Sequence, residues 1–152
     1  RVLLGFSSSP SDPSQEWTDV TAYVVGMEGV ECSRGRADEM SACEPGTASL
    51  VLDNSDGRFT WGYAGSPHFP HVKPGKAIRV EVSADDGLTW WPRFTGYVDG
   101  WPTTFADDVA VDIRCPITAV DRLAKLSGLA KLRHPIAQEF GTATTVVGSR
   151  LG

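Results

Sequence analysis

Hydrophobic and polar residues alternate along several short stretches of this chain, which is the pattern of half-buried β-strands. The clearest stretch covers residues 47–53. Its apolar positions, Ala48, Leu50 and Leu52, fall on one face of an extended chain. The same alternation, or a high content of β-branched and aromatic residues, predicts further strands at 1–6, 19–25, 29–34, 76–83, 88–98 and 109–115.

Two segments between these stretches have the composition of tight turns. The first contains Asp56 and Gly57, and the second contains Asp85 and Gly87. Asp bonds readily to nearby backbone amides, and Gly accepts positive φ at no steric cost. The second turn joins two alternating stretches and therefore predicts a hairpin. We expect structural roles for all four residues.

A helical pattern begins only near the end of the sequence. Residues 118–121 resemble a capping box with Asp in place of Glu, Leu123 and Leu126 are three residues apart, and Gly128 is suited to end a helix. The predicted fold is therefore mainly β, a small barrel or sandwich of six to seven strands with one C-terminal α-helix.

Composition agrees with a single β-rich domain. The chain has 152 residues, of which 16 are Gly and 10 are Pro, so many turns separate short elements. We expect residues 1–128 to form one β-barrel or sandwich domain with its helix, and residues 129–152 to be a linker or the start of a further domain. The net charge of −5 argues against specific nucleic-acid binding. No apolar run approaches the roughly 20 residues of a membrane helix, so we expect no membrane insertion.

The thiols and imidazoles do not have metal-ligand spacing. Cys32, Cys43 and Cys115 form no paired-cysteine motif, and His68 and His71 have no evident third ligand. The cysteines are either buried free thiols or, for Cys32 and Cys43, a disulfide. We expect neither a metal site nor a cofactor.

Motifs of catalysis and calcium binding are also missing. The sequence has no nucleophile elbow, no zinc-protease motif and no phosphate-binding Gly-Lys-Ser/Thr loop, which predicts that the chain is not an enzyme. Residues 53–57 superficially resemble a calcium loop, but Gly57 falls at the fifth position where Gly is required at the sixth. A turn is the better interpretation.

Residues 83–90 match the Asp-box pattern, Ser-x-Asp-x-Gly-x-Thr-Trp, of sialidase-like propellers. In that family the box is a structural hairpin, and the catalytic residues lie elsewhere. A propeller repeats such a unit over several blades. This chain has one full copy and a loose echo at 56–61, so we interpret residues 83–90 as an isolated hairpin turn.

Aromatic residues are the main candidates for an interaction surface. The loop 61–74 contains Trp61, Tyr63 and Phe69, and is either an ordered loop or a surface arm. Trp90 and Trp91 are adjacent, so on a strand they face opposite sides and one of them covers a second surface. The five Trp residues either pack in the core and interfaces or form a sugar-binding platform.

Arg34 and Arg36 flank a glycine and point the same way if the chain is extended. Two interpretations remain open for them. They either dock to an acidic partner or pair with nearby carboxylates. The candidate carboxylates are Asp38, Glu39, Asp53 and Asp56.

Four motifs occur in an order that is typical of one protein family. They are Trp-Thr-Asp-Val-Thr at 17–21, Ser-Arg-Gly-Arg at 33–36, Gly-Thr-Ala-Ser-Leu running to Leu-Asp-Asn at 46–54, and Asp-Gly-Arg-Phe-Thr at 56–60. In this order they resemble the start of minor tail or tail-hub proteins of long-tailed bacteriophages infecting actinobacteria. Further matches occur at 66–67, 74–80, 94–98 and 118–126. Trp61 stands where that family has a Pro, a departure that concerns loop detail.

The resemblance implies a β-barrel hub domain in the virion, at the tail tip, made in the cytoplasm of the host bacterium. It implies a homo-oligomeric ring, a trimer or alternatively a hexamer, formed through sheet edges and the loop 61–74. The expected partners are the distal tail ring, the tape-measure protein and other tail-tip proteins. Two alternatives remain: a carbohydrate-binding module, and part of a cell-wall-degrading tail enzyme.

Overall fold

A computed structural model describes residues 1–10, 12–26, 29–35, 44–105, 113–124 and 126. The described chain is mainly β, as the alternating pattern predicts. Two of its eight strands are only two residues long, which explains why the sequence predicts fewer. The elements are β1 Val2–Gly5, β2 Thr18–Asp19, the 3-10 turn η1 Thr21–Tyr23, β3 Glu31–Gly35, β4 Glu44–Asp53, β5 Ala77–Val82, β6 Trp91–Val98, β7 Thr104–Phe105 and β8 Ile113–Val120.

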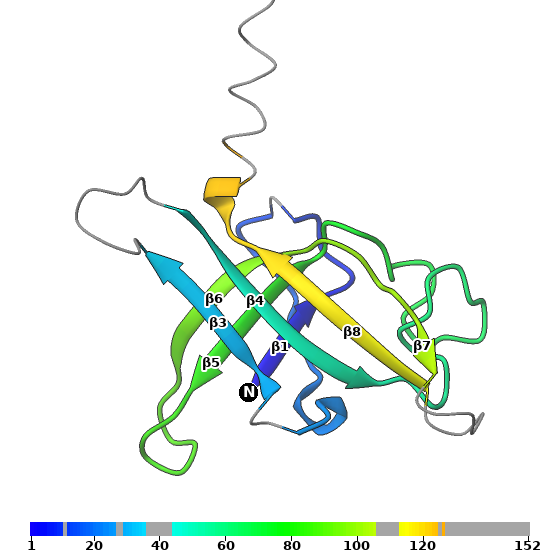
Figure 1. The fold of residues 1–152 in the computed structure, drawn as a ribbon, viewed down its shortest axis with the longest axis horizontal. Coiled ribbons are helices and arrows are strands. Elements are labelled where there is room, and N and C mark those ends of the chain that lie inside the picture. The colour runs from blue at the N-terminus through cyan, green and yellow to red at the C-terminus, as the bar shows by residue number, and fades with distance from the viewer. Residues whose placement is uncertain (11, 27–28, 36–43, 106–112, 125, 127–152) are drawn as a thin grey trace, which may run out of the picture.

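All strand pairs are antiparallel, in the order β2-β1-β5-β6-β8-β4-β3, with β7 paired to β8. In Figure 1, β3, β4 and β8 form one layer and cross in front of β1, β5 and β6. Only Tyr97↔Val120 and Val98↔Ala119 pair β6 with β8, so the sheet turns from one layer to the other there. The sheet is not closed into a barrel. Of the two predicted arrangements, the chain therefore adopts the sandwich.

The core lies between the two layers. On β4 the buried positions include Ala48, Leu50 and Leu52, which confirms the predicted strand face. Each fully buried Leu or Val contributes roughly 1.5–3 kcal/mol relative to an exposed one. The residues that meet this face from β8 and from the opposite layer are Val2, Leu4, Ile78, Val80, Phe94, Val98, Cys115, Ile117 and Ala119.

The predicted strand at 19–25 is wrong beyond Asp19, because the chain turns there. The Asp19 carboxylate accepts hydrogen bonds from the Thr21 amide at 2.9 Å and from its hydroxyl at 2.5 Å. The Thr21 hydroxyl oxygen in turn accepts a bond from the Val2 amide at 2.9 Å. Short polar side chains thus bind the backbone locally and offer it an alternative to a sheet ladder.

The predicted helix begins later than the capping-box pattern indicates. Residues 118–120 belong to β8, which pairs with β4 along its length, and Ala119 is buried in the core. Helical residues follow at 122–124 and 126. Asp121 caps them, because its Oδ1 accepts bonds from the Leu123 amide at 2.9 Å and the Ala124 amide at 3.2 Å. Strand pairing has overridden the local signal at Thr118. The predicted helix end at Gly128 and the predicted strand residues 109–112 lie outside the described residues.

The long loop between β4 and β5 is ordered, one of the two options that the sequence left open. Asn54 is fully buried at its start. Its Oδ1 accepts a bond from the Phe59 amide at 2.8 Å, and its Nδ2 donates to the Thr60 hydroxyl at 2.9 Å. Phe59 stacks on Trp101 with ring centroids 6.2 Å apart. These contacts fix the loop to one end of the sandwich.

Candidate interaction surfaces

The turn after β4 is built by its own side chains. Gly57 has a φ of +74°, and its amide donates to the Asn54 carbonyl at 2.8 Å. The Asp56 carboxylate forms an ion pair with Arg58 at 2.6 Å. Hydrogen bonding to Arg58 lowers the pKa of Asp56. The turn thus positions Arg58, whose guanidinium lies over the Tyr23 ring at 3.8 Å from its centroid.

Beyond this turn, three aromatic side chains project from the loop into solvent. Trp61, Tyr63 and Phe69 are 65%, 48% and 49% exposed, and we call them the loop surface. The loop beneath them is anchored: His68 stacks on Phe6 with centroids 4.0 Å apart, and Trp101 Nε1 donates to the Lys73 carbonyl at 2.8 Å. The loop surface is therefore apolar area held outward on a well-packed support.

The second turn is tied by Ser83 and Asp85. The Ser83 hydroxyl donates to Asp85 Oδ1 at 2.7 Å and accepts from the Gly87 amide at 2.8 Å. Asp85 Oδ1 also accepts from the Thr89 amide at 2.8 Å, and these bonds lower the pKa of Asp85. Gly87 has a φ of +89°. The segment is a hairpin turn fastened by its Ser and Asp, the arrangement that the Asp-box pattern predicts.

The two adjacent tryptophans of this hairpin differ in their surroundings. Trp90 precedes β6 and is half-buried, with the Arg1 guanidinium 4.4 Å from its ring centroid. Trp91 begins β6 and is 50% exposed. Val82 and Leu88 are also exposed, so we define the hairpin surface as Val82, Leu88 and Trp91.

Arg34 lies exposed on β3, beside Cys32 and Arg93, and forms no ion pair with a carboxylate of the described residues. The carboxylates considered for it are occupied elsewhere or lie outside the described residues. Asp56 pairs with Arg58, and Asp53 accepts a bond from the Ser55 amide at 2.9 Å. Outside the described residues are Arg36, Asp38 and Glu39.

A cleft of about 360 Å³ opens between the two layers near Arg34, and we call it the interlayer cleft. Sequence reasoning missed it, because its walls come from segments far apart in the chain and no local motif marks them. It is lined by Arg1, Val2, Val30, Cys32, Val80, Glu81, Val82 and Arg93.

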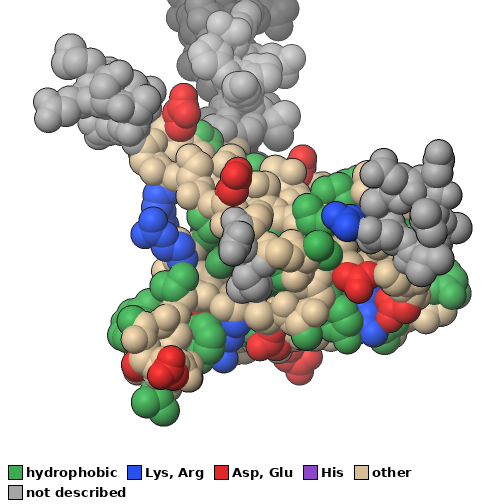
Figure 2. Space-filling model, turned by 60° about the horizontal axis from the view of Figure 1, so that its bottom comes forward, with side chains coloured by type: hydrophobic (Ala, Val, Ile, Leu, Met, Phe, Trp, Pro, Cys, Tyr) green, Lys and Arg blue, Asp and Glu red, His purple; other side chains and the backbone are tan. Residues whose placement is uncertain are grey.

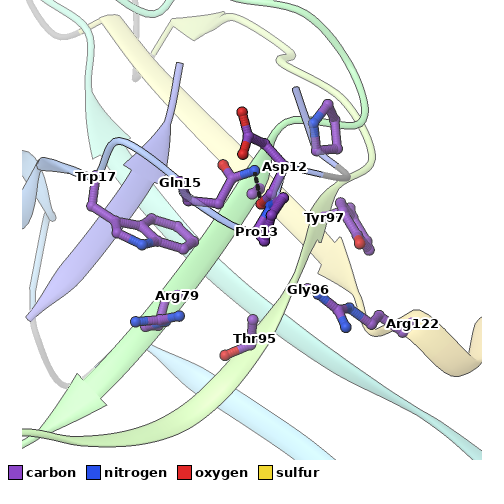
Figure 3. Close-up of a pocket in the computed structure, with 11 residues that line it drawn as sticks. Asp12, Pro13, Gln15, Trp17, Arg79, Thr95, Gly96, Tyr97 and Arg122 are labelled. Carbon is purple, nitrogen blue, oxygen red and sulfur yellow. Dashed lines mark hydrogen bonds between the residues drawn. The ribbon is translucent and has the colours of Figure 1, made fainter. Parts of the chain in front are cut away.

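A second hollow, of about 120 Å³, lies outside the sandwich over β5 and β6 (Figure 3). The Arg79 guanidinium stands 4.5 Å from the Trp17 ring centroid, and Gln15 Nε2 donates to the Asp12 carbonyl at 3.1 Å. Arg79 Nε and Gln15 Oε1 are buried without a hydrogen-bond partner among the described residues. The hollow is lined by both apolar and polar side chains, among them Pro13, Trp17 and Thr95.

Burial shifts the pKa of further titratable side chains among the described residues. No group of three or more His, Cys, Asp and Glu there could hold a metal ion. Burial lowers the pKa of His68 and raises that of the Cys115 thiol to about 12. Cys32 and Cys115 carry free thiols, whereas Cys43 lies outside the described residues.

Comparison of the sequence with known protein families and with curated proteins finds no match. The resemblance to phage tail proteins therefore stays a prediction. Among the described residues no helix is long and apolar enough to cross a membrane. The features of the described residues that could contact a partner or ligand are the loop surface, the hairpin surface and the two hollows.

Proposed function

We propose that this chain is a structural component of a phage tail tip, a hub or minor tail protein that assembles as a ring with other tail proteins. The main support for this proposal is the set of exposed apolar side chains. Apolar side chains project from two firmly built segments, the loop surface and the hairpin surface, while the core between the layers is complete without them. Side chains held outward in this way are typical of protein interfaces.

The positions of the two surfaces fit a ring. In Figure 1 the loop between β4 and β5 lies at one end of the sandwich and the β5–β6 hairpin at the other. A contact between two different surfaces of identical subunits is heterologous, and it closes into a ring when the rotation between subunits allows. The resemblance carried by the sequence motifs implies that the ring is at the tail tip and that it is a trimer or, alternatively, a hexamer. The net charge of −5 keeps such a ring from binding passing DNA.

The test is incorporation of the protein into phage particles. In a phage that encodes this chain, Trp61→Ser and Leu88→Ser should each leave the melting temperature of the purified protein unchanged. Each should reduce the amount of the protein at the tail tip, measured by immunogold labelling and electron microscopy. Phe105→Ser is the matched control, because Phe105 is 69% exposed and belongs to neither surface.

Three results would count against the proposal. They are wild-type protein found outside the virion, a lone asymmetric copy in a reconstruction of the tail, and normal incorporation of both surface variants. Finding the isolated chain as a monomer in solution would not by itself count against the ring, since a ring contact below about 1,000 Å² depends on neighbouring proteins in the tail.

A carbohydrate-binding module is the second candidate, and the hollow beside Trp17 favours it. Its lining combines the Trp17 ring with polar side chains such as Arg79 and Thr95, a combination that suits the ring and the hydroxyls of a sugar. Glycan-array binding that is lost in Trp17→Ala and retained in Trp61→Ser would support this candidate over the tail component.

A further inference from the structure

Strand β3 forms one end of the sheet. It pairs with β4, and no described strand pairs with its other edge. An open edge exposes a row of backbone amides and carbonyls that can bind another extended chain. The register of β3 shifts between Ser33 and Gly35, which limits regular pairing to the first half of the strand.

The interlayer cleft lies beside this first half. Val30 and Cys32 reach it from the β3 side, and Val2, Val80 and Val82 from β1 and β5. These side chains are short and apolar. An added strand would place every second side chain in the cleft, and the lining would favour small aliphatic ones there.

The rim of the cleft is basic. Arg1 and Arg93 line the cleft, and Arg34 lines an adjoining hollow with Cys32 and Arg93. Figure 2 shows Lys and Arg side chains gathered on the left of the molecule, above the hairpin. Among the described lining residues Glu81 is the only acid, and it is buried and paired with Arg1 at 2.6 Å. Arg34 and Arg93 form no ion pair with a described carboxylate.

We propose that the open edge of β3 and the interlayer cleft bind an extended segment of a partner protein, in which small aliphatic residues alternate with Asp or Glu. The segment adds to β3 as a further strand. Its aliphatic side chains enter the cleft, so its carboxylates face away from it. The long, exposed side chains of Arg34 and Arg93 reach outward from the rim to these carboxylates. The interlayer cleft shares Val82 with the hairpin surface, but this inference is tested by protection of Cys32 and the tail assignment by the Trp61 and Leu88 variants, so either can fail alone.

A polypeptide explains the site better than a small molecule does. The backbone of β3 supplies affinity for any extended chain, the apolar walls select the inward side chains, and the arginines select acidic residues on the segment. A compact ligand would use the cleft and leave the strand edge unpaired.

Cys32 provides a reporter inside the cleft. In a Cys43→Ser background it is the accessible thiol to follow, because Cys115 is fully buried and its thiol has a pKa of about 12. The probe is a short capped peptide in which Val and Asp alternate. At a peptide concentration about ten times Kd, maleimide modification of Cys32 should slow about ten-fold, as expected for competition with a bound ligand.

Two altered peptides test the two halves of the recognition. Replacing each Asp of the peptide by Lys should abolish protection, and methylating the backbone nitrogens on one edge should also abolish it. Arg34→Gln together with Arg93→Gln should weaken binding about ten-fold, and added salt should reduce the difference. Arg122→Gln is the matched control, an exposed arginine outside the cleft. Circular dichroism melting verifies that each variant is folded.

Several outcomes overturn the proposal. The first is an absence of protection by the Val/Asp peptide with a folded protein. Equal protection by the Lys peptide would show that the site does not select acidic residues. Equal protection by the methylated peptide would show that the segment does not pair with β3 as a strand. Protection that rises with protein concentration in the absence of peptide assigns the cleft to a second copy of this chain instead. None of these results bears on incorporation at the tail tip, which is measured separately.

Discussion

Gly46 and Asp121 hold the ends of β4 and β8 together by two hydrogen bonds in opposite directions. The Gly46 amide donates to Asp121 Oδ2 at 2.8 Å, and the Asp121 amide donates to the Gly46 carbonyl at 3.0 Å. The other carboxylate oxygen of Asp121 caps the helical residues that follow. A Cβ on Gly46 would stand 3.0 Å from Oδ2 and 3.2 Å from the Ser33 carbonyl oxygen, so a larger residue there would have to displace these atoms slightly. One side chain thus ends a strand, begins a helix and fastens both to the neighbouring strand.

Asp121→Ala should destabilise the domain by about 1–3 kcal/mol, because it removes a helix cap and leaves the Gly46 amide without its partner. Urea unfolding followed by tryptophan fluorescence measures the change. Asp121→Asn keeps an acceptor oxygen and should lose less. A full loss in Asp121→Asn would show that the charge, rather than the hydrogen bonds, matters.

Gly96→Ala should destabilise the domain by about 1–3 kcal/mol through overpacking. Its Cβ would lie 2.3 Å from the Val120 carbonyl oxygen and 2.7 Å from the Phe94 ring, where β6 crosses β8. Gly100→Ala is the control, since no atom lies within 4 Å of a Cβ at that position. Equal unfolding free energies for the two variants would contradict the close packing described at this crossing.

Gly57→Val should cost roughly 1–3 kcal/mol, because Val does not tolerate the positive φ that the turn requires. The added side chain would also press on the Tyr63 ring, which lies 3.0 Å from the Cβ position. Thermal melting measures the loss. Calcium should leave the melting temperature unchanged. A melting temperature that rises with calcium, and no longer rises in Asp56→Ala, would show that the segment binds calcium.

Stability should fall between neutral and mildly acidic pH partly because of His68. Burial against Phe6 holds its pKa below the ordinary value of 6.5, so the unfolded chain takes up a proton before the folded chain does. The contribution is therefore complete above about pH 7 and is lost as pH falls through the unfolded pKa. His68→Phe should flatten this part of the pH profile of the melting temperature, whereas the exposed His71→Phe should leave it as it is. Identical profiles for wild type and His68→Phe would refute the assignment.

Local sequence patterns predicted the strands wherever alternation and burial coincide. The stretch 47–53 is the clearest case, because its alternating side chains face a core that needs them. The patterns failed at Thr21 and Thr118 for opposite reasons. At Thr21 a side-chain hydrogen bond replaces a strand, and at Thr118 a distant strand partner replaces the start of a helix. At Thr21 the local bonds to Asp19 combine with one from the distant Val2 amide, whereas at Thr118 the distant strand β4 alone decides.

Some of the interaction surfaces could likewise be predicted from the sequence, and others could not. Trp61, Tyr63 and Phe69 could be singled out because they crowd into one loop, and a loop carries its side chains outward. The interlayer cleft could not be predicted, since Val30, Arg93 and Arg1 meet only through the order of strands in the sheet. The hollow at Trp17 and Arg79 is hidden for the same reason.

The place of β8 in the sheet has a consequence for how the chain folds as it leaves the ribosome. Among the described strands β8 is the last in sequence, and it joins β6 to β4, so the two layers are not connected through the sheet until residues 113–120 have been synthesised. Until then β4 presents a long open edge, β6 lacks the two residue pairs that join it to β8, and the apolar faces of Leu50 and Phe94 lack one side of their packing. A nascent chain is therefore most prone to aggregation just before β8 emerges. The core is completed only when β8 has been synthesised, so a premature stop before residue 113 yields a chain with two unjoined layers.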